Sequence, residues 1–453
     1  MATLQKRYGL LTAICMVVGI VIGSGVFFKA QDVLKETNGN MLEGILAWII
    51  GGAIMVVIAS TFAVMATKYQ NVGGLVDYAE ATCGKTYGYF VGWFLSLIYY
   101  PAMTAVLSWM CARYTLVALF NYPSASPEAL YSPECIAIAA FYLITVYFIN
   151  AIAPKFSGKL QVSTTFIKLV PLVFISIVGT LIGIFNGKLD ANFNFVSAAQ
   201  TATGGGLFAA ICCTAFAYEG WIIATTINAE IKDSKRNLPI ALLVGSLITV
   251  AVYICYYIGV LGLEDTETLI SLGTSVAFNY FGVAVASLIN FLIIISCLGT
   301  LNGLMVACTR STYSLSARNE GIAPKIFSQI DAVTNMPNNS ASLGLLACSA
   351  WFVHFIGGQF FGWFGVFAFD SSELPIITLY PIYLPILIRY MMMEKKLGVF
   401  KRFVLPSLSI VGIGIMVAAS ILRHGIDNAW YLLIFAIILA IGAVVKYFPK
   451  KSA

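Results

Sequence analysis

The stretch that decides the fold is Gly19-Ile20-Val21-Ile22-Gly23-Ser24-Gly25-Val26-Phe27-Phe28, inside the first apolar segment of the chain. Glycine in a helix interior costs up to about 1 kcal/mol relative to alanine, so two glycines on either side of Ser24 allow a helix to unwind there. Unwound backbone inside a bilayer is tolerated only where protein or a water-lined cavity satisfies its polar groups. The alternative is close packing of helices through small residues, and the residues alone leave both interpretations open.

Composition indicates that this segment belongs to a membrane protein. The chain has 453 residues, of which 60% are apolar and 10% charged, and its mean hydropathy is +0.89. Soluble domains are about 45–50% apolar and about 25% charged, which excludes a soluble enzyme, a secreted domain and a disordered chain. At about 20 residues per crossing, the length has room for about a dozen spans and no sizeable soluble domain.

Twelve apolar segments of spanning length predict an all-α integral membrane protein with twelve transmembrane helices. Two of the segments, residues 88–120 and 361–391, are longer than a bilayer crossing and must tilt, bend or run past the bilayer. The twelve segments cover residues 9–30, 44–66, 88–120, 135–153, 159–185, 203–228, 238–262, 281–310, 342–357, 361–391, 403–422 and 427–447.

The distribution of basic residues predicts the orientation. With both termini on the inside, 20 of the 26 lysines and arginines fall on the inside, and Arg113 and Lys168 lie within spans. Such a bias follows the positive-inside rule, so we expect both termini to be cytoplasmic in a multi-pass protein of the cell membrane. No basic cluster is large enough to suggest a nucleic-acid partner. The basic residues expected on the outside are Lys29, Lys35, Lys188 and Arg423.

The chain offers little material for a metal site or for catalysis. Its ten cysteines have no C-x-x-C spacing, and His354 and His424 lie in separate segments. No Ser/His/Asp set, H-E-x-x-H motif or P-loop is present, and these are the patterns that common enzymes and ATP-driven pumps require. We therefore expect no metal, no cofactor and no enzymatic activity. Hydropathy alone allows a channel, but a repeated filter sequence is absent.

The sixth segment contains a second candidate break. Gly204-Gly205-Gly206 is followed by Phe216-Ala217-Tyr218-Glu219-Gly220-Trp221, which places an acid and a glycine inside an apolar helix. A carboxylate near the bilayer centre is costly and is a functional candidate by default. Because the breaks fall in the first and sixth segments, they have the spacing of an inverted-repeat transporter with its site near the midplane.

Lys168 is the most deeply placed basic residue of the fifth segment. It lies nine residues after Lys159, roughly 14 Å along a helix at 1.5 Å per residue. That depth is too great for the side chain to reach the cytoplasmic surface easily. The ammonium must therefore face the protein interior, either in a functional role or as the partner of a buried acid.

Several motifs, in the right order from residue 10 to about 330, resemble those of the amino acid–polyamine–organocation transporter superfamily. Gly19-x-x-Ile22-Gly23-Ser24-Gly25-Val26-Phe27 is similar to its first-helix motif. The sixth-helix stretch Phe216-Ala217-Tyr218-x-Gly220-Trp221 is similar to that of the L-amino-acid transporter branch. Three other matches are Gly73-Gly74 with Tyr78, Gly84, Tyr87 and Gly92-Trp93; Lys232 to Pro239; and Asn302, Arg310, Tyr313, Ala317-Arg318, Gly321 and Pro324. Bacterial serine/threonine or alanine/serine/cysteine exchangers are the relatives to expect.

The resemblance implies a five-plus-five inverted repeat with unwound first and sixth helices and two extra helices. Residues 1–185 and 203–391 would form the repeats, 403–447 the extra helices and 448–453 a cytoplasmic tail. The α-carboxylate of an amino acid would lie on Ile22 to Val26, and its amine would meet carbonyls near Ile20 and Phe216 to Glu219. Phe216 would close over the substrate. The implied binding residues are Ile20, Ile22, Gly23, Ser24, Gly25, Val26, Phe216, Ala217, Tyr218, Glu219 and Trp221.

The resemblance also assigns a role to Lys168, which matches the fifth-helix lysine of this branch. Sodium-coupled relatives bind an ion between helices one and eight at that place. An ammonium there would bridge carbonyls of helix one and a hydroxyl of helix eight, for which Ser296 is the candidate. Transport independent of sodium is therefore expected, with an amino acid and the bilayer as partners and no obligatory protein partner.

Two features depart from the family pattern. The branch often has a small residue where this chain has Glu219, and Asp370-Ser371-Ser372-Glu373-Leu374-Pro375 matches no family motif. Asp370 and Glu373 are candidates for a gate or a proton site, or they face water at a break before Pro375. The expected function is exchange of small neutral L-amino acids by alternating access. The alternatives are a cationic amino-acid or polyamine transporter and a proton-coupled amino-acid symporter.

Overall fold

The computed structural model describes residues 9–69, 74–195, 205–223, 225, 231–334 and 336–447. Its regular elements in these ranges are helices, which confirms the predicted all-α class. The α-helices are α1 Leu10–Val21, α2 Gly25–Glu36, α3 Met41–Lys68, α4 Leu75–Cys83, α5 Lys85–Phe94, α6 Tyr100–Phe120, α7 Pro127–Tyr131, α8 Pro133–Ile152, α9 Pro154–Phe174, α10 Thr180–Phe185, α11 Lys188–Phe193, α12 Gly206–Tyr218, α13 Ser234–Leu261, α14 Thr266–Leu272, α15 Val283–Ser316, α16 Pro324–Phe327, α17 Asn338–Phe361, α18 Leu374–Met393, α19 Leu405–His424 and α20 Asp427–Tyr447; 3-10 or π-helical turns are Leu95–Tyr99, Ile175–Gly179, Thr274–Phe281, Gly365–Phe367 and Phe400–Val404.

The described residues contain 10 helices long and apolar enough to cross a membrane. The number of spans rises to 11 if α1 and α2, which are bent by 46° at the break between them, are counted as one span. The remaining predicted span corresponds to α18, whose apolar part, Ile377–Met393, is shorter. The structure therefore supports a multi-pass membrane protein, while the count of twelve stays a prediction.

Of the two predicted segments that are longer than a bilayer crossing, only the one at residues 88–120 lies within a single span of the structure. Residues 85–120 form one span of 36 residues, in which a π-helical turn, Leu95–Tyr99, lies between α5 and α6. The single segment 361–391 is wrong, because α17 ends at Phe361 and α18 begins only at Leu374. Gly362 and Gly365 adopt positive φ angles of 64° and 56°, a conformation that glycine accepts readily and that ends helices.

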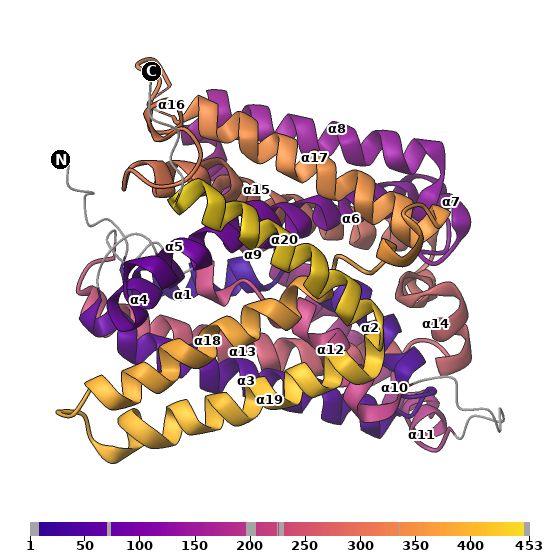
Figure 1. Cartoon of the computed structure of the whole chain (residues 1–453). Helices are drawn as coiled ribbons and strands as arrows, with labels where there is room; N and C mark the ends of the chain where they lie inside the picture. The colour runs from indigo at the N-terminus through magenta and orange to yellow at the C-terminus, as the bar shows by residue number, and fades with distance from the viewer. Residues whose placement is uncertain are drawn as a thin grey trace.

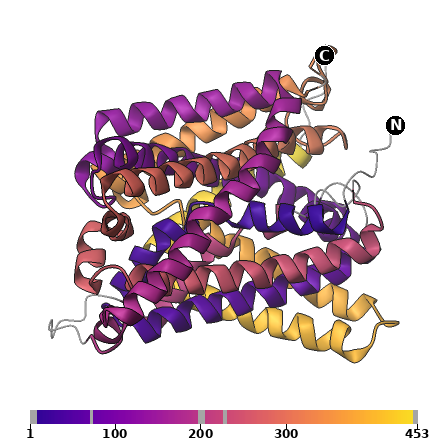
Figure 2. The ribbon, with the colours of Figure 1, turned by 180° about the vertical axis from the view of Figure 1, so that it is seen from behind.

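Helices pack around a central layer in which the broken helices lie. In both ribbon views α8 and α17 lie side by side along one edge of the bundle, and α3 and α19 along the opposite edge (Figures 1 and 2). Between these edges, α2 and α12 pack against each other, and α1 packs against α13 and α9. We call the face where α1 begins and α20 ends the terminal face, and the other the opposite face.

Large apolar side chains cover the outside of the bundle. Phe141 and Phe148 on α8 and Ile437 and Ile441 on α20 are 64%, 50%, 51% and 51% exposed. Soluble proteins rarely expose apolar patches beyond a few hundred Å², so these surfaces are suited to lipid. The division into repeats at residues 1–185 and 203–391 stays a prediction, and the tail 448–453 lies outside the described residues.

Candidate functional site

The first break leaves backbone donors at the start of α2 without a partner among the described residues. The amide of Ile22 still bonds the Val18 carbonyl at 2.8 Å, and the next helical bond is from Phe28 to Ser24 at 3.1 Å. The amides of Gly25, Val26 and Phe27 belong to the first turn of α2, where an α-helix has no internal acceptors for its N–H groups. These donors and the positive end of the helix dipole suit a carboxylate.

The second break lies at Glu219 and Gly220. Helix α12 ends at Tyr218, and Glu219 is extended, with φ −75° and ψ 165°. Gly220 has a φ of 104°, which favours glycine over residues with a side chain. The earlier glycine stretch only marks the start of α12 at Gly206 and is not a break within a helix; Gly204 lies outside the described residues.

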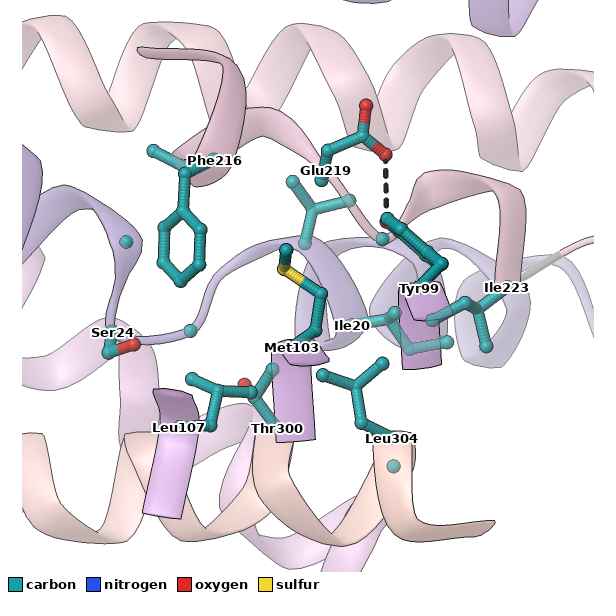
Figure 3. Close-up of a pocket in the computed structure, with 16 residues that line it drawn as sticks. Ile20, Ser24, Tyr99, Met103, Leu107, Phe216, Glu219, Ile223, Thr300 and Leu304 are labelled. Carbon is teal, nitrogen blue, oxygen red and sulfur yellow. Dashed lines mark hydrogen bonds between the residues drawn. The ribbon is translucent and has the colours of Figure 1, made fainter. Parts of the chain in front are cut away.

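The two breaks enclose a pocket together with α6 and α15. The space between the atoms is about 550 Å³, part of which is open to solvent. Figure 3 shows Phe216 and Ser24 at one end of it, with Tyr99 and Ile223 toward the other. The lining residues are Ile20, Val21, Gly23, Ser24, Gly25, Tyr99, Met103, Leu107, Phe216, Ala217, Glu219, Gly220, Ile223, Thr300, Gly303 and Leu304.

Ser24 is the polar group best placed to receive a ligand. Its side chain is fully buried and lines the pocket. Among the described residues, its hydroxyl has no hydrogen-bond partner. A buried hydroxyl without a partner is costly, so a ligand atom that bonds Ser24 Oγ beside the free amides of α2 would be stabilised.

Four of the residues implied by the resemblance do not line this pocket. Ile22 and Val26 are fully buried, with their side chains in the core behind the break. Tyr218 donates to the Trp48 carbonyl at 2.9 Å, and the Trp221 ring packs on Phe62 and Tyr383. The other seven do line it: Ile20, Gly23, Ser24, Gly25, Phe216, Ala217 and Glu219.

Glu219 lies among phenol groups. Its Oε2 accepts a hydrogen bond of 3.1 Å from the Tyr99 hydroxyl, as the dashed line in Figure 3 marks. The hydroxyl of Tyr380 and the backbone of Gly220 also lie beside the carboxyl group. No basic side chain is among these partners in the described residues, so an ionised Glu219 would be a buried charge without a counter-ion, which is costly.

Tyr253 on α13 links the two breaks. Its hydroxyl lies 3.1 Å from the carbonyl oxygen of Val21 and 3.1 Å from that of Ala217. Both carbonyls belong to residues that line the pocket. One hydroxyl thus holds the end of α1 close to the last turn of α12.

We expect Tyr253→Phe to weaken substrate binding about fivefold. The change removes one buried hydrogen bond, worth about 1 kcal/mol, or roughly a factor of 5 in an equilibrium constant. Tyr257→Phe is the matched control, because Tyr257 lies one turn further along α13 and its buried hydroxyl has no partner among the described residues. Apparent affinity from uptake titrations measures both, and an equal effect of the two changes would contradict the assigned link.

Lys168 connects α1 with α15. The buried ammonium donates to the Gly19 carbonyl at 2.5 Å and to the Thr300 hydroxyl at 3.0 Å. The expectation that Ser296 supplies this hydroxyl is wrong: Ser296 instead donates to the Gly23 carbonyl at 3.3 Å. Ser296 and Thr300 lie four residues apart and share one helix face, so spacing could not choose between them.

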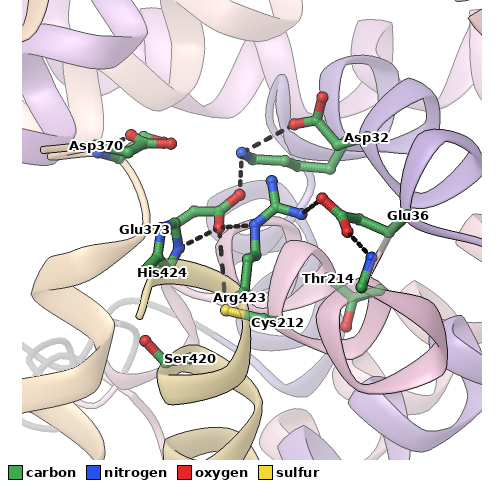
Figure 4. A network of polar contacts seen from close by, with 12 residues as sticks. Asp32, Glu36, Cys212, Thr214, Asp370, Glu373, Ser420, Arg423 and His424 are labelled. Atoms are coloured by element: carbon green, nitrogen blue, oxygen red, sulfur yellow. Dashed lines mark hydrogen bonds and ion pairs between the residues drawn. The ribbon is translucent and has the colours of Figure 1, made fainter. Parts of the chain in front are cut away.

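A network of buried charges, on the opposite-face side of the pocket, surrounds Glu373. Its carboxylate pairs with Lys29 from α2 and, at 2.8 and 2.9 Å, with Arg423 and His424 from α19. Lys29 also pairs with Asp32 at 3.1 Å, and Arg423 with Glu36. Figure 4 shows Glu373 at the centre of these contacts, which tie α2, α18 and α19 together. Lys29 and Arg423, which were expected on the outer side of the membrane, lie on the opposite-face side of the pocket, and their side chains are largely buried.

Asp370 accepts hydrogen bonds from its own turn, whereas Glu373 pairs with side chains of other helices. Its Oδ1 accepts the backbone N–H of Ser372 at 2.7 Å, and its carbonyl accepts that of Leu374 at 3.1 Å. Asp370 therefore shapes the turn that begins α18. Its side chain forms no ion pair among the described residues.

Cys212, Glu373 and His424 offer three ligand atoms within 4.8 Å of one another. Both oxygens of Glu373 are already engaged, one by Lys29 and the other by Arg423 and His424. A metal ion there would have to displace these ion pairs and would add positive charge beside two cations. The residues do not fit a metal site.

Ion pairs also join helices near the terminal face. Arg318, after α15, contacts Asp77 at 2.6 Å and Glu80 at 2.7 Å, both on α4. Lys446 on α20 contacts Glu320 at 2.8 Å, and Lys68 on α3 pairs with Glu394. The pocket thus lies between two layers of ion pairs.

Sequence reasoning missed the pocket residues that carry no unusual signal. Tyr99, Met103 and Leu107 on the π-helical turn and α6, and Leu304 on α15, are ordinary residues of apolar helices. Only their spacing of three or four residues along α6 indicates one common face. Nothing in the sequence says that this face meets the breaks.

A bundle of apolar helices around a buried pocket, with that pocket formed by two interrupted helices, defines a secondary membrane transporter. Residues 8–444 match the family model described as "Amino acid permease". The serine/threonine exchanger SteT of Bacillus subtilis is 31% identical over 70% of this chain and 69% of its own length. The b(0,+)-type amino acid transporter 1 of Mus musculus is 28% identical, over 72% and 66%, and the human cystine/glutamate transporter 25%, over 74% and 65%.

The chain therefore belongs to the amino acid permease family. These comparisons confirm the resemblance to amino acid–polyamine–organocation transporters and to the L-amino-acid branch. The chain is an amino-acid transporter and not an enzyme. The matched regions cover about two thirds of the length of each of these relatives.

Proposed function

We propose that the protein is a sodium-independent exchanger of small neutral L-amino acids that works by alternating access. The observation that carries the proposal is the pocket between the breaks, where Ser24 Oγ and the first amides of α2 face a wall that is mostly apolar. The amides suit the α-carboxylate. The apolar wall, formed by Met103, Leu107 and Leu304, suits an uncharged side chain.

The position of Lys168 supports independence from sodium. Its ammonium links a carbonyl of α1 to a hydroxyl of α15, the kind of oxygen ligands that a bound cation would otherwise hold together. A fixed positive charge there repels a second cation. We also propose that the terminal face is cytoplasmic, since the basic residues concentrate on that side.

Uptake into proteoliposomes tests this function directly. Labelled serine, alanine, threonine, lysine and glutamate are supplied outside, with and without unlabelled amino acid inside, in sodium or choline buffer. We expect saturable uptake of the first three, acceleration by internal amino acid and no effect of sodium. Uptake that needs sodium, or that internal amino acid does not accelerate, would contradict the proposal.

Glu219 favours a second candidate function. An acid that lines the pocket could neutralise the side chain of lysine, arginine or a diamine in a site of low dielectric constant. Against this, Glu219 bonds to Tyr99 and is surrounded by hydroxyl groups, as a protonated carboxyl group would be.

The change Glu219→Gln distinguishes the two functions, because it preserves shape and removes the charge. For a neutral substrate we expect uptake of serine, alanine and threonine within about threefold of wild type. Leu304→Met, a volume-conserving change at the same pocket, is the control. Strong wild-type uptake of lysine or a diamine that is lost selectively in Glu219→Gln would establish the second candidate.

A further inference from the structure

A second, smaller cavity lies behind α12, between α18 and α19. It has room for about one water molecule. Four of its lining residues carry polar groups: Cys212, Glu373, Tyr380 and Ser420. A buried water needs two to four such partners, so this cavity is suited to hold one.

The second cavity joins two features that are otherwise separate. At one end, Glu373 belongs to the charged network and lies 2.9 Å from Nε2 of His424. At the other end, Tyr380 lines the cavity and its hydroxyl lies beside Glu219, which lines the substrate pocket. Polar groups of Glu373 and Tyr380 therefore connect His424 with Glu219 through the second cavity.

We propose that this cavity is a proton pathway, along which His424 and Glu373 supply a proton to Glu219 through water and the hydroxyl group of Tyr380. The proposal goes beyond amino-acid exchange and rests on it, because the proton moves only as the transporter cycles.

The transfer changes the number of bound protons only at its two ends, His424 and Glu219. Protonated His424 gives its Nε2 proton to Glu373 Oε2, and Glu373 gives a proton to the water. The water gives one proton to the Tyr380 oxygen as Tyr380 gives its own to a Glu219 oxygen. His424 has lost one proton and Glu219 has gained one, and the next proton enters from the opposite face.

The surroundings of the two acids explain the direction. Around Glu219 stand the phenols of Tyr99, Tyr380 and Tyr383, so the closed pocket favours the neutral acid, because an unpaired buried charge is costly. Around Glu373 stand Lys29 and Asp32 from α2, Cys212 and Cys213 from α12, Arg423 and His424 from α19, and Asp370 from the turn before α18. Closing the pocket draws a proton from the opposite face, and opening it to water on the terminal face releases that proton.

The test measures proton movement in proteoliposomes that contain a pH-sensitive dye. Both sides hold a mixture of the twenty standard L-amino acids, and the outside is made acidic. We expect wild-type vesicles to acidify at least fivefold faster with the mixture than without it. Tyr380→Phe, which keeps the ring and removes the hydroxyl, and Glu219→Gln should each lose at least nine tenths of this increment.

Tyr383→Phe is the matched control. Tyr383 lies near Glu219 and is on α18, the helix that carries Tyr380. Its hydroxyl has no partner among the described residues, and it does not line the second cavity, so proton movement should persist in this variant. Val417→Phe, which fills the cavity from α19, gives an independent block if Tyr380→Phe folds poorly. Wild-type proton movement in both Tyr380→Phe and Val417→Phe, or no acidification by wild type above that of empty vesicles, would overturn the pathway. Labelled serine, alanine and threonine exchange at equal pH is measured in parallel, and its absence would overturn the proposed function instead.

Discussion

Replacement of Gly25 by valine is expected to abolish amino-acid uptake, with a loss of at least 100-fold. A Cβ atom at Gly25 would lie 2.5 Å from the Cα and 2.9 Å from the Cβ of Ala217. Real Cβ atoms do not approach backbone so closely, and α12 cannot yield as a flexible side chain would. Overpacking costs about 1–3 kcal/mol, and the separation of α2 from α12 also moves the free amides away from the pocket.

The control for Gly25→Val is Gly414→Val. Gly414 lies on α19 and has no atom within 4 Å of the position of a new Cβ, so this variant should transport like wild type. Purified amounts and gel-filtration profiles check that both variants fold. Near-normal uptake by Gly25→Val would show that the close contact of α2 and α12 does not shape the site.

The same experiment tests what the free amides bind. Serine should compete with labelled substrate, whereas ethanolamine, which is serine without its carboxylate, should compete at least 100-fold more weakly. Two hydrogen bonds to a charged group, at about 1.5–3 kcal/mol each, account for such a difference. Equal competition by ethanolamine would instead indicate an amine or polyamine transporter.

Replacement of Lys168 by methionine is expected to lower turnover about 100-fold without unfolding the protein. Methionine has a similar volume and leaves the packing intact, but it removes the hydrogen bonds to Gly19 and Thr300. Each bond to a charged donor contributes about 1.5–3 kcal/mol. Because these bonds join α1 to α15, their loss uncouples substrate binding at the break from the movement of α1 against α15.

Two further variants show whether Lys168 acts through Thr300. Thr300→Val removes the hydroxyl that accepts from Lys168 and should lower turnover about tenfold, whereas Ser296→Ala removes only a 3.3 Å hydrogen bond to Gly23 and should lower it less than threefold. Turnover is measured as the maximum exchange rate per folded protein, in sodium and in choline. Unchanged turnover in Lys168→Met, or strict sodium dependence of the wild type, would contradict the role of this lysine as the replacement for an ion.

Several site residues were predictable because each breaks the rules for an apolar helix. Gly23 and Gly25 stand where a helix needs no glycine, and Lys168 and Glu219 place charge where lipid allows none without a partner. The structure brings Gly23, Gly25 and Glu219 to the lining of the pocket. It places Lys168 behind the break instead, against Gly19 and Thr300.

Residues beyond a break were less predictable, because the direction of the chain there depends on what it packs against. Trp221 follows Glu219 by two residues, yet its ring packs on Phe62 and Tyr383, away from the pocket. Lys29 follows the break of the first span by a few residues, and its side chain is only 1% exposed because Glu373, 344 residues further along the chain, pairs with it. Sequence position gives no measure of such a pairing.

The sequence by itself determined the class of the protein and marked two stretches in which a helix could be interrupted. Hydropathy, charge and helix propensity are properties of short stretches, so they could be evaluated without knowledge of distant contacts. Only the tertiary structure decided that Tyr99, Met103 and Thr300 complete the pocket, that Thr300 and not Ser296 receives Lys168, and that Glu373 meets Lys29, Arg423 and His424. Those facts depend on how helices far apart in the chain pack against one another, which is set by shape and charge over the whole bundle rather than by any local pattern.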